Sequence, residues 1–307
     1  MNPKITILVL NWNGGPDTIA CLNSFKDLRY PNFRVIVLDN ASSDDSWKRF
    51  AQYPTPPYRI AFVQTGANLG FGGGNNVGIK RALTEGTDYI FFLNNDTVLA
   101  PDALAKMVAA AAADPQIGLV GALMLTTDEP ARIWFCGGRF NWLRTRGFHP
   151  HYGEPYREGM FPEHPLDVDY ITGGALLAKR RVFEEVGLLP EDYFLYYEDA
   201  DFNARAAAAG WRRVVVPSAK VWHKGSASAK AGSPSYQYYH LRNGLTFSWR
   251  HGPSRVLTLA ASLWLAAKEF VKIVIGYHRV RSIGGLHGVI DFWRGRNGAR
   301  KSRPQKL

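Results

Sequence analysis

The 307-residue chain has only two cysteines, Cys21 and Cys136, which are too few for a disulfide framework and match no spacing of metal ligands. We interpret both as small buried side chains of a protein from a reducing compartment. The apolar segment 256–267 has only 12 residues and is too short to cross a bilayer. Because Met1 to Lys4 run directly into an apolar strand, we expect no signal peptide. These absences favour a cytoplasmic protein.

Acidic residues are scarce in the last fifth of the chain. From Arg242 onward 13 lysines and arginines stand against Glu269 and Asp291, whereas the first 241 residues carry 24 basic and 24 acidic side chains. The net charge of +11 therefore belongs to the C-terminal part. Such a segment suits anionic lipid or nucleic acid, but no nucleic-acid-binding motif accompanies it, so we expect no nucleic acid partner.

Apolar runs alternate with helical segments along most of the chain. The runs that predict buried strands are residues 5–10, 33–38, 59–63, 88–93, 117–125 and 211–216, and regular structure resumes at Tyr170. The segments that predict helices are 16–26, 77–83, 101–113, 180–186 and 199–209. This alternation predicts an α/β fold with a doubly wound, mostly parallel sheet and helices on both faces. Residues 132–169 are irregular, and we interpret them as a loop-rich insertion that carries part of an acceptor site.

Four polar residues fall where predicted strands end, namely Asn11, Asp39, Asn68 and Asp96. Ligands of doubly wound sheets bind beyond the carboxyl ends of the strands, so these residues are expected to share one binding edge. The glycine-rich run from Gly70 to Gly74 follows the third strand and is predicted to be a loop whose backbone can approach a ligand. It does not fit the dinucleotide-binding pattern after the first strand, which argues against a dehydrogenase.

The segment after Pro234 is predicted to be helical. At 100° per residue its polar side chains fall within an arc of about 120°. They are Ser254, Thr258, Ser262, Lys268, Glu269 and Lys272. The other faces carry Leu257, Leu263, Trp264, Phe270, Val271 and Val274. This amphipathic helix either lies on a membrane or packs on the protein. The neighbouring cations Arg279, Arg281, Arg294, Arg296, Arg300, Lys301 and Arg303 favour an anionic membrane surface.

Two acidic clusters carry the chemistry that the sequence indicates. Asn94-Asn95-Asp96 follows the apolar run 89–93, and Glu198-Asp199-Ala200-Asp201 begins an alanine-rich helix about a hundred residues later. A carboxylate at the end of a buried strand can hold a metal ion that a phosphate shares. A carboxylate from another element can act as a base on the other side of the reacting centre. The two clusters together indicate transfer chemistry on a nucleotide-activated substrate.

A series of motifs, in order and spacing, resembles the family 2 glycosyltransferases and within them a rhamnosyltransferase-like subgroup. The motifs are Asn11-Trp12-Asn13-Gly14, 37–44, 68–75, 93–96, Thr172-Gly173-Gly174-Ala175, 196–201, 222–226 and 238–243. The resemblance covers about residues 4–250, and no single motif carries it. It implies a GT-A fold, a nucleoside-diphosphate sugar as donor, a divalent cation (Mg²⁺ or Mn²⁺) and inversion at the anomeric carbon.

The resemblance also implies roles for single residues. Asp199 matches the position of the catalytic base, and Asp96 and His223 match metal contacts, although Asn94 stands where the family often has a first aspartate. Donor-binding positions are Asn11, Asn13, Asp39, Asn68, Gly72, Asn75, Asn94, Asn95 and Lys224. Acceptor-binding positions are Gly173, Gly174, Tyr197 and Glu198. Trp12, Phe71 and Tyr197 either stack on sugar or base rings or pack in the core.

These patterns divide the chain into a glycosyltransferase domain at 1–233 and a helical, basic, membrane-associating region at 234–307. Within the domain, 1–125 is expected to bind the nucleotide sugar and 126–233 the acceptor. We expect an enzyme that moves rhamnose from dTDP-rhamnose to a glycan or lipid-linked acceptor on the inner face of the cell membrane. A UDP-hexose donor is one alternative, and a non-catalytic module that binds a sugar nucleotide or a membrane is another.

Overall fold

The computed structural model describes residues 2–225 and 232–300. A central sheet has the strand order β10-β12-β6-β11-β4-β1-β2-β3. The strands are β1 (Ile5–Asn11), β2 (Phe33–Asp39), β3 (Arg59–Gln64), β4 (Tyr89–Asn94), β6 (Ile117–Thr126), β10 (Leu166–Asp167), β11 (Ala175–Lys179) and β12 (Arg212–His223). Short β5 (Thr97–Leu99) pairs with β12, and β7 (Ile133–Phe135) with β6. Strands β8 (Arg139–Asn141) and β9 (Arg146–Phe148) form a separate hairpin.

The sheet is mixed, because β5, β7, β10 and β11 run antiparallel to the strands that they pair with. β1 pairs in parallel with β2 and β4, β2 with β3, and β6 with β12, as the strand–helix alternation predicts. β11 runs antiparallel between β4 and β6. It begins at Ala175, later than expected at Tyr170, because the preceding Thr172–Gly174 segment turns toward the carboxyl end of β4, where the carbonyl of Gly174 accepts from the amide of Asn94. β12 continues to His223, well past the predicted end at 216.

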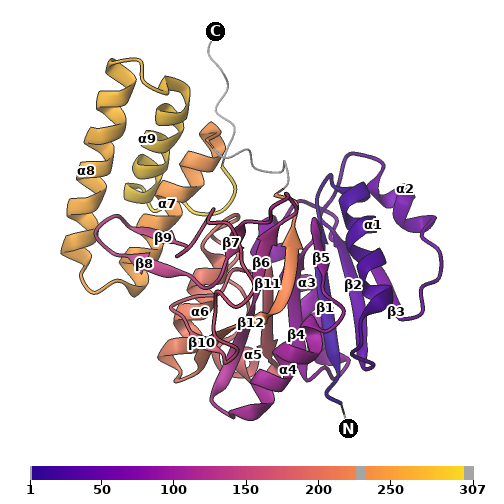
Figure 1. Ribbon diagram of the computed structural model, residues 1–307. Coiled ribbons are helices and arrows are strands. Elements are labelled where there is room, and N and C mark those ends of the chain that lie inside the picture. The colour runs from indigo at the N-terminus through magenta and orange to yellow at the C-terminus, as the bar shows by residue number, and fades with distance from the viewer. Residues whose placement is uncertain (1, 226–231, 301–307) are drawn as a thin grey trace.

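Helices surround the sheet (Figure 1). They are α1 (Gly15–Ser24), the 3₁₀ turn η1 (Phe25–Asp27), α2 (Ser46–Ala51), α3 (Gly70–Thr84), α4 (Ala103–Ala113), α5 (Arg180–Val186) and α6 (Glu198–Ala208). α3 packs on β1 and β2, and α4 packs on β6 and β12. Cys21 on α1 and Cys136 after β7 are both buried, free thiols, as expected.

The glycine-rich run is helical, not a loop, because α3 begins at Gly70. Its glycines allow the helix to lie close to its neighbours. A Cβ on Gly74 would stand 2.6 Å from Leu10 Cδ1, and one on Gly70, which has a φ of +74°, would collide with the Phe194 carbonyl. The run therefore has a packing reason for its composition, since no larger side chain fits between α3, β1 and the 190–194 segment.

Three helices follow the sheet and stand together at one side of it (Figure 1). They are α7 (Pro234–His251), α8 (Arg255–Val274) and α9 (Arg279–Trp293), with a small apolar core built on Leu245, Leu265 and Val289. Among residues 2–225 and 232–300, no helix is long and apolar enough to cross a membrane. Lys301 and Arg303, two of the predicted membrane-facing cations, lie outside the described residues.

Candidate active site

The polar residues at the ends of β1 and β2 are hydrogen-bonded to one another. Asn11 and Asp39 face each other in the sheet register, and the Asn11 Nδ2 donates to Asp39 Oδ1 at 2.9 Å. The Ser42 hydroxyl also donates to Asp39 Oδ1, at 2.6 Å. Both Asn11 and Asp39 are buried, so this pair forms the floor of the edge. Their expected contact with the donor stays a prediction.

The loops above this floor present the more exposed predicted donor contacts. The exposed Asn13 is held over the β2 loop, because its Oδ1 accepts from the amide of Ser43 at 2.7 Å. Asn68 lies just before α3, and its Oδ1 accepts from the Gly70 amide at 3.0 Å. Asn95 joins the end of β4 to the floor, since its Nδ2 donates to Thr18 Oγ1 at 3.0 Å. The edge is therefore one connected polar surface, as the sequence predicts.

Two other predicted donor contacts are inside the packing of α3. Asn75 is buried and its Nδ2 donates to the Phe71 carbonyl one turn earlier. A Cβ on Gly72 would stand 2.7 Å from the Pro190 carbonyl oxygen. Local packing thus explains both residue types, and a donor contact for either stays a prediction.

Asp96 and His223 lie side by side at the ends of β4 and β12. The His223 Nε2 is 3.2 Å from Asp96 Oδ1 and 3.3 Å from Asn94 Nδ2, and the ring packs on Trp134 with centroids 4.3 Å apart. Both residues are more than nine-tenths buried. β12 positions the histidine because its extension past 216 pairs His223 with Thr97.

The spacing and the chemistry of this pair fit two ligands of one divalent cation. Adjacent ligands of an octahedral cation with bonds of about 2.1 Å stand about 3 Å apart, close to the separation of Nε2 and Oδ1. Carboxylate and imidazole are both ligands of Mn²⁺-type ions. Within residues 2–225 and 232–300, no third histidine, cysteine or acidic residue completes a metal cluster, so remaining ligands would have to come from substrate and water.

Lys224 stands at the rim of this pair. Its backbone amide donates to the Asp96 carbonyl at 3.0 Å, and its Nζ reaches Asp17 Oδ1 at 2.8 Å. The hydrogen bond with Asp17 raises the pKa of Lys224, so the side chain stays cationic. An exposed, charged lysine beside a buried carboxylate is suitably placed for a phosphate group.

Asp199 is fixed by backbone donors from two elements. Its Oδ2 accepts from the Gly173 amide at 2.9 Å, and its Oδ1 accepts from the Ala200 amide at 2.8 Å. Burial raises the pKa of Asp199, and these donors offset only part of that shift. Burial, with the charge of Asp199 as a second cause, raises the pKa of the adjacent Glu198 well above its ordinary value. Within the described residues, Glu198 Oε2 has no hydrogen-bond partner.

The Gly173-Gly174 turn brings the two acidic clusters to one place. Gly173 donates to Asp199, while a Cβ on the next residue, Gly174, would lie 3.2 Å from Asn94 Nδ2. Asn94 in turn contacts His223, the partner of Asp96. A short chain of contacts therefore links the predicted base to the predicted metal ligands, and Asp96 and Asp199 belong to the same edge of the sheet.

The segment before Asp199 has an unusual backbone. Phe194, Tyr196 and Tyr197 all have positive φ angles, between 66° and 76°. This conformation is costly for residues with a Cβ and persists only when the surroundings enforce it. Tyr197 is buried and its hydroxyl donates to the Thr145 carbonyl, so it shapes the site from within, and its expected contact with acceptor stays a prediction.

Two residues of α7 enforce this conformation, although the sequence motifs that contain them predict no role for either. The Asn243 Nδ2 donates to the carbonyls of Leu195 at 2.7 Å and Tyr196 at 2.9 Å. The fully buried Arg242 donates to the Tyr193 carbonyl at 2.7 Å. We call Asn243, with these hydrogen bonds, the Asn243 clamp. Its carbonyl partners are 47 to 50 residues away in the sequence, so no local pattern predicts it. The only signal is the presence of an asparagine and an arginine on the buried side of a helix.

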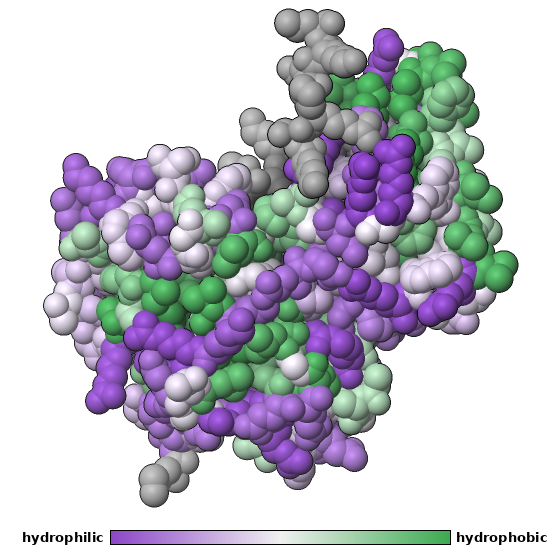
Figure 2. All heavy atoms as spheres, turned by 180° about the vertical axis from the view of Figure 1, so that it is seen from behind, coloured by the Kyte–Doolittle hydropathy of each residue, from purple (hydrophilic) through white to green (hydrophobic). Residues whose placement is uncertain are grey.

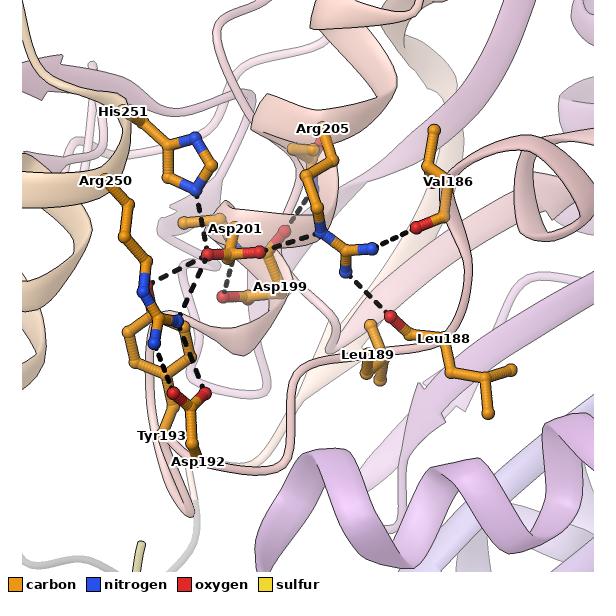
Figure 3. A network of polar contacts seen from close by, with 12 residues as sticks. Val186, Leu188, Leu189, Asp192, Tyr193, Asp199, Asp201, Arg205, Arg250 and His251 are labelled. Atoms are coloured by element: carbon orange, nitrogen blue, oxygen red, sulfur yellow. Dashed lines mark hydrogen bonds and ion pairs between the residues drawn. The ribbon is translucent and has the colours of Figure 1, made fainter. Parts of the chain in front are cut away.

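Asp201, two residues after the predicted base, ties α6 to α7 (Figure 3). Its carboxylate accepts from Arg205 Nε at 2.9 Å, from the Tyr193 hydroxyl at 3.0 Å and contacts His251 Nε2 at 2.8 Å. Arg250 joins the network and pairs with Asp192. Burial pushes the pKa of Asp201 upward, but the contacts with His251 and Arg205 outweigh it and hold the pKa below its ordinary value. These contacts give Asp201 a structural role.

Replacing Asp201 with Asn is expected to destabilise the protein by roughly 3 kcal/mol, because the cations around it lose a buried countercharge. The stabilisation is present above the unfolded pKa and is lost as pH falls through the lowered folded pKa, so the variant should also lose less stability on acidification. Urea denaturation at several pH values measures both effects. Asp45→Asn is the matched control, since its exposed pair with Arg49 has the same i, i+4 spacing and should contribute little. Equal effects of the two substitutions would contradict the buried network.

The cavity of about 740 Å³ lined by Lys4, Arg34 and Arg59 lies at the amino ends of β1, β2 and β3, away from these residues. None of the predicted site residues lines this cavity. We therefore place the candidate active site at the carboxyl edge, on the hydrogen bonds described above.

Comparisons with known proteins show which sequences and folds this chain resembles. The sequence profile described as "Glycosyl transferase family 2" matches residues 6–187. The N-acetylglucosaminyl-diphospho-decaprenol L-rhamnosyltransferase of Mycobacterium tuberculosis is 27% identical, over 94% of this chain and 99% of that protein. The dTDP-rhamnosyl transferase RfbF of Shigella flexneri is 23% identical, over 94% of this chain and 97% of that protein.

Solved structures share the fold. A mannosyltransferase from Pyrobaculum calidifontis, in complex with GDP-Man and Mn²⁺, has a TM-score of 0.60 at 16% identity and covers 95% of this chain and 88% of its own. S. aureus TarS 1–349 with UDP-GlcNAc has a TM-score of 0.57 at 16% identity, with 95% and 92% covered. The expected GT-A-type α/β fold is confirmed.

Proposed function

Because the chain belongs to glycosyl transferase family 2 and is a glycosyltransferase, we propose that it transfers rhamnose from dTDP-rhamnose, with inversion, to a glycan or lipid-linked acceptor. The reaction would serve the synthesis of a cell-surface polysaccharide. Two observations favour this donor and acceptor: relatives named as rhamnosyltransferases match over nearly their whole length, and one of them is named for a diphospho-decaprenol substrate.

The observation that carries the proposal is the linkage of Asp199 to the Asp96–His223 pair through Gly173, Gly174 and Asn94. Asp199 accepts the proton of the attacking acceptor hydroxyl, while the nucleoside diphosphate departs from the other side of the anomeric carbon. Its raised pKa makes it a stronger base than an ordinary aspartate. The two backbone amides that bind its oxygens hold it in one orientation.

Asp96 and His223 would hold a Mg²⁺ or Mn²⁺ ion, which when bound neutralises charge on the departing diphosphate. Lys224 adds a fixed positive charge at the same rim. Residues 1–125 would bind the nucleotide sugar, and 126–233 would bind the acceptor together with the Asn243 clamp. We place the enzyme at the cytoplasmic face of the membrane, because one relative is named for a lipid-linked substrate.

The test is a thermal-shift panel of dTDP-rhamnose, UDP-glucose, UDP-GlcNAc and GDP-mannose, each with Mn²⁺, Mg²⁺ or a chelator. A donor at a hundred times its Kd stabilises the folded state by about 2.7 kcal/mol, which gives a clear rise in Tm. We expect that rise with dTDP-rhamnose and a cation. If only a UDP-hexose raised the Tm, the donor would be that UDP-hexose and not dTDP-rhamnose. If no sugar nucleotide raised the Tm with any cation, donor binding would be refuted.

A further inference from the structure

Helix α8 presents its apolar side chains to the outside. Trp264 is 53% exposed, Phe270 59% and Val274 69%. The large exposed apolar residues run along the helix and to the residue just after it, and they are Val256, Leu259, Leu263, Trp264, Phe270, Val271, Val274 and Ile275. At 100° per residue they fall within an arc of about 160°. We call this surface the α8 face, and Figure 2 shows it as hydrophobic colour on the upper right of the molecule.

The opposite side of α8 is the polar arc that the sequence predicts, and all of it except the exposed Lys268 points inward. Glu269 is 1% exposed and its Oε1 accepts from Lys272 Nζ at 2.8 Å. Ser262 is buried and accepts from Trp293 Nε1 at 2.9 Å. α9 approaches α7 through Gly284 and Gly288, where a Cβ would strike backbone.

This arrangement reverses that of a helix in a water-soluble bundle, whose apolar stripe faces the core. Apart from the small apolar core of Leu245, Leu265 and Val289, polar and small residues line the contacts among the three helices, while the large apolar side chains of α8 listed above face outward, as expected where the surroundings are apolar. Because α8 has a polar inner side and no described helix is fit to span a bilayer, α8 suits a position along a surface and not across it.

Cations border the α8 face and exposed acids do not. Arg255 and Arg279 flank the two ends of the helix, and Lys268 lies beside Trp264 with its Nζ 4.8 Å from the ring centroid. Among described residues 242–300, the only acidic side chains are Glu269 and Asp291; neither is exposed, and both are paired with cations. Burial and the neighbouring Lys272 lower the pKa of Lys268, and Arg144 and Arg146 of the β8–β9 hairpin add to this effect.

We propose that the α8 face docks in the plane of an anionic phospholipid surface, with its apolar side chains below the headgroups and the bordering cations against them. At this surface the enzyme would meet its lipid-linked acceptor, an inference that rests on the proposed function. A second copy of this chain is a poorer occupant. In a twofold contact the same basic border meets itself, and like charges repel.

The experiment is flotation of the full-length protein with vesicles of phosphatidylcholine alone or with 30 mol% phosphatidylglycerol, an anionic fraction of roughly the size at which polybasic segments bind. We expect binding to the anionic vesicles that weakens as salt rises. Trp264→Glu should weaken it by about tenfold or more, because a charge enters the apolar surface. Lys268→Gln and Arg279→Gln should each weaken it about fivefold. Trp47→Glu is the matched control, since Trp47 is exposed on α2, far from α8 (Figure 1).

Two further measurements separate this proposal from others. Trp264→Glu should keep the turnover of a short water-soluble acceptor, and Asp199→Asn should keep vesicle binding, so failure of the proposed chemistry and failure of docking are distinguishable. Sedimentation velocity tests for a dimer. A wild-type dimer that Trp264→Glu dissociates, without vesicle binding, would overturn the proposal in favour of a second copy. Equal binding of wild type and Trp264→Glu to anionic vesicles would also overturn it.

Discussion

Replacing Asp199 with Asn is expected to lower kcat by about 10²–10⁴-fold, because the amide cannot accept the proton of the acceptor hydroxyl. Donor affinity should change little, since Asp199 is bound by the Gly173 and Ala200 amides and has no part in the proposed diphosphate contacts. Release of nucleoside diphosphate under single-turnover conditions measures the chemical step. Calorimetric titration with the donor measures affinity separately.

The control is Asp27→Asn, an equal change at an exposed aspartate of the 3₁₀ turn η1. It should leave kcat and donor affinity as they are. If Asp199→Asn kept wild-type turnover, the base would be another group. If it lost donor affinity and turnover in parallel, Asp199 would belong to the donor site and not to proton transfer.

The pH profile of the wild type follows from the same residue. Burial raises the pKa of Asp199, and only the ionised form can act as base. As pH falls through this raised pKa, kcat/KM should fall with it, so the acid limb should lie above that of an ordinary aspartate. An acid limb at or below the ordinary aspartate range would contradict a buried carboxylate base.

Strand ends were predictable because two simple signals coincide there. An apolar run followed by Asn11, Asp39 or Asp96 marks both the strand and its exit, and the parallel pairing then brings those exits to one edge. The pairing of Asp96 with His223 was harder, since it depends on β12 running seven residues past its predicted end. The family resemblance supplied it where periodicity alone did not.

Other features depend on tertiary contacts that no local pattern encodes. Gly70 to Gly74 look like a flexible loop, yet close packing against β1 and the 190–194 segment selects helix. Asp201 belongs to the same acidic cluster as Asp199, yet its contacts with His251 and Arg205 come from the tertiary structure and one helical turn away. The periodicity of α8 correctly predicts which residues share its polar arc, but it does not predict whether the polar or the apolar side faces the protein. That direction depends on Glu269 and Ser262 finding partners on α8 and α9.

Replacing Asp96 with Asn is expected to remove the cation dependence of donor binding and to lower kcat/KM by about 10²–10³-fold. The basis is that a bound cation contributes several kcal/mol of charge stabilisation at a departing phosphate. The substitution preserves shape but removes the anionic ligand that stands 3.2 Å from His223 Nε2. The measurement is the Mn²⁺-dependent part of the donor-induced rise in Tm, followed by kinetics across a Mn²⁺ titration.

Asp96 and Asp199 should then separate by readout, although a chain of contacts joins them. The effect of Asp96→Asn should appear in the Mn²⁺ titration and in donor affinity. The effect of Asp199→Asn should appear only in the rate of the chemical step. Asp102→Asn on the far side of β5, where the aspartate pairs with Lys106, controls for removal of a carboxylate near this part of the sheet. If Asp96→Asn bound donor with unchanged Mn²⁺ dependence, the cation would be held elsewhere and the His223–Asp96 contact would be only a structural hydrogen bond. Because the two carboxylates act in one step of the proposed reaction, on opposite sides of one anomeric carbon, the losses in the double variant should be smaller than the product of the two single losses, and the double variant should be as insensitive to Mn²⁺ as Asp96→Asn.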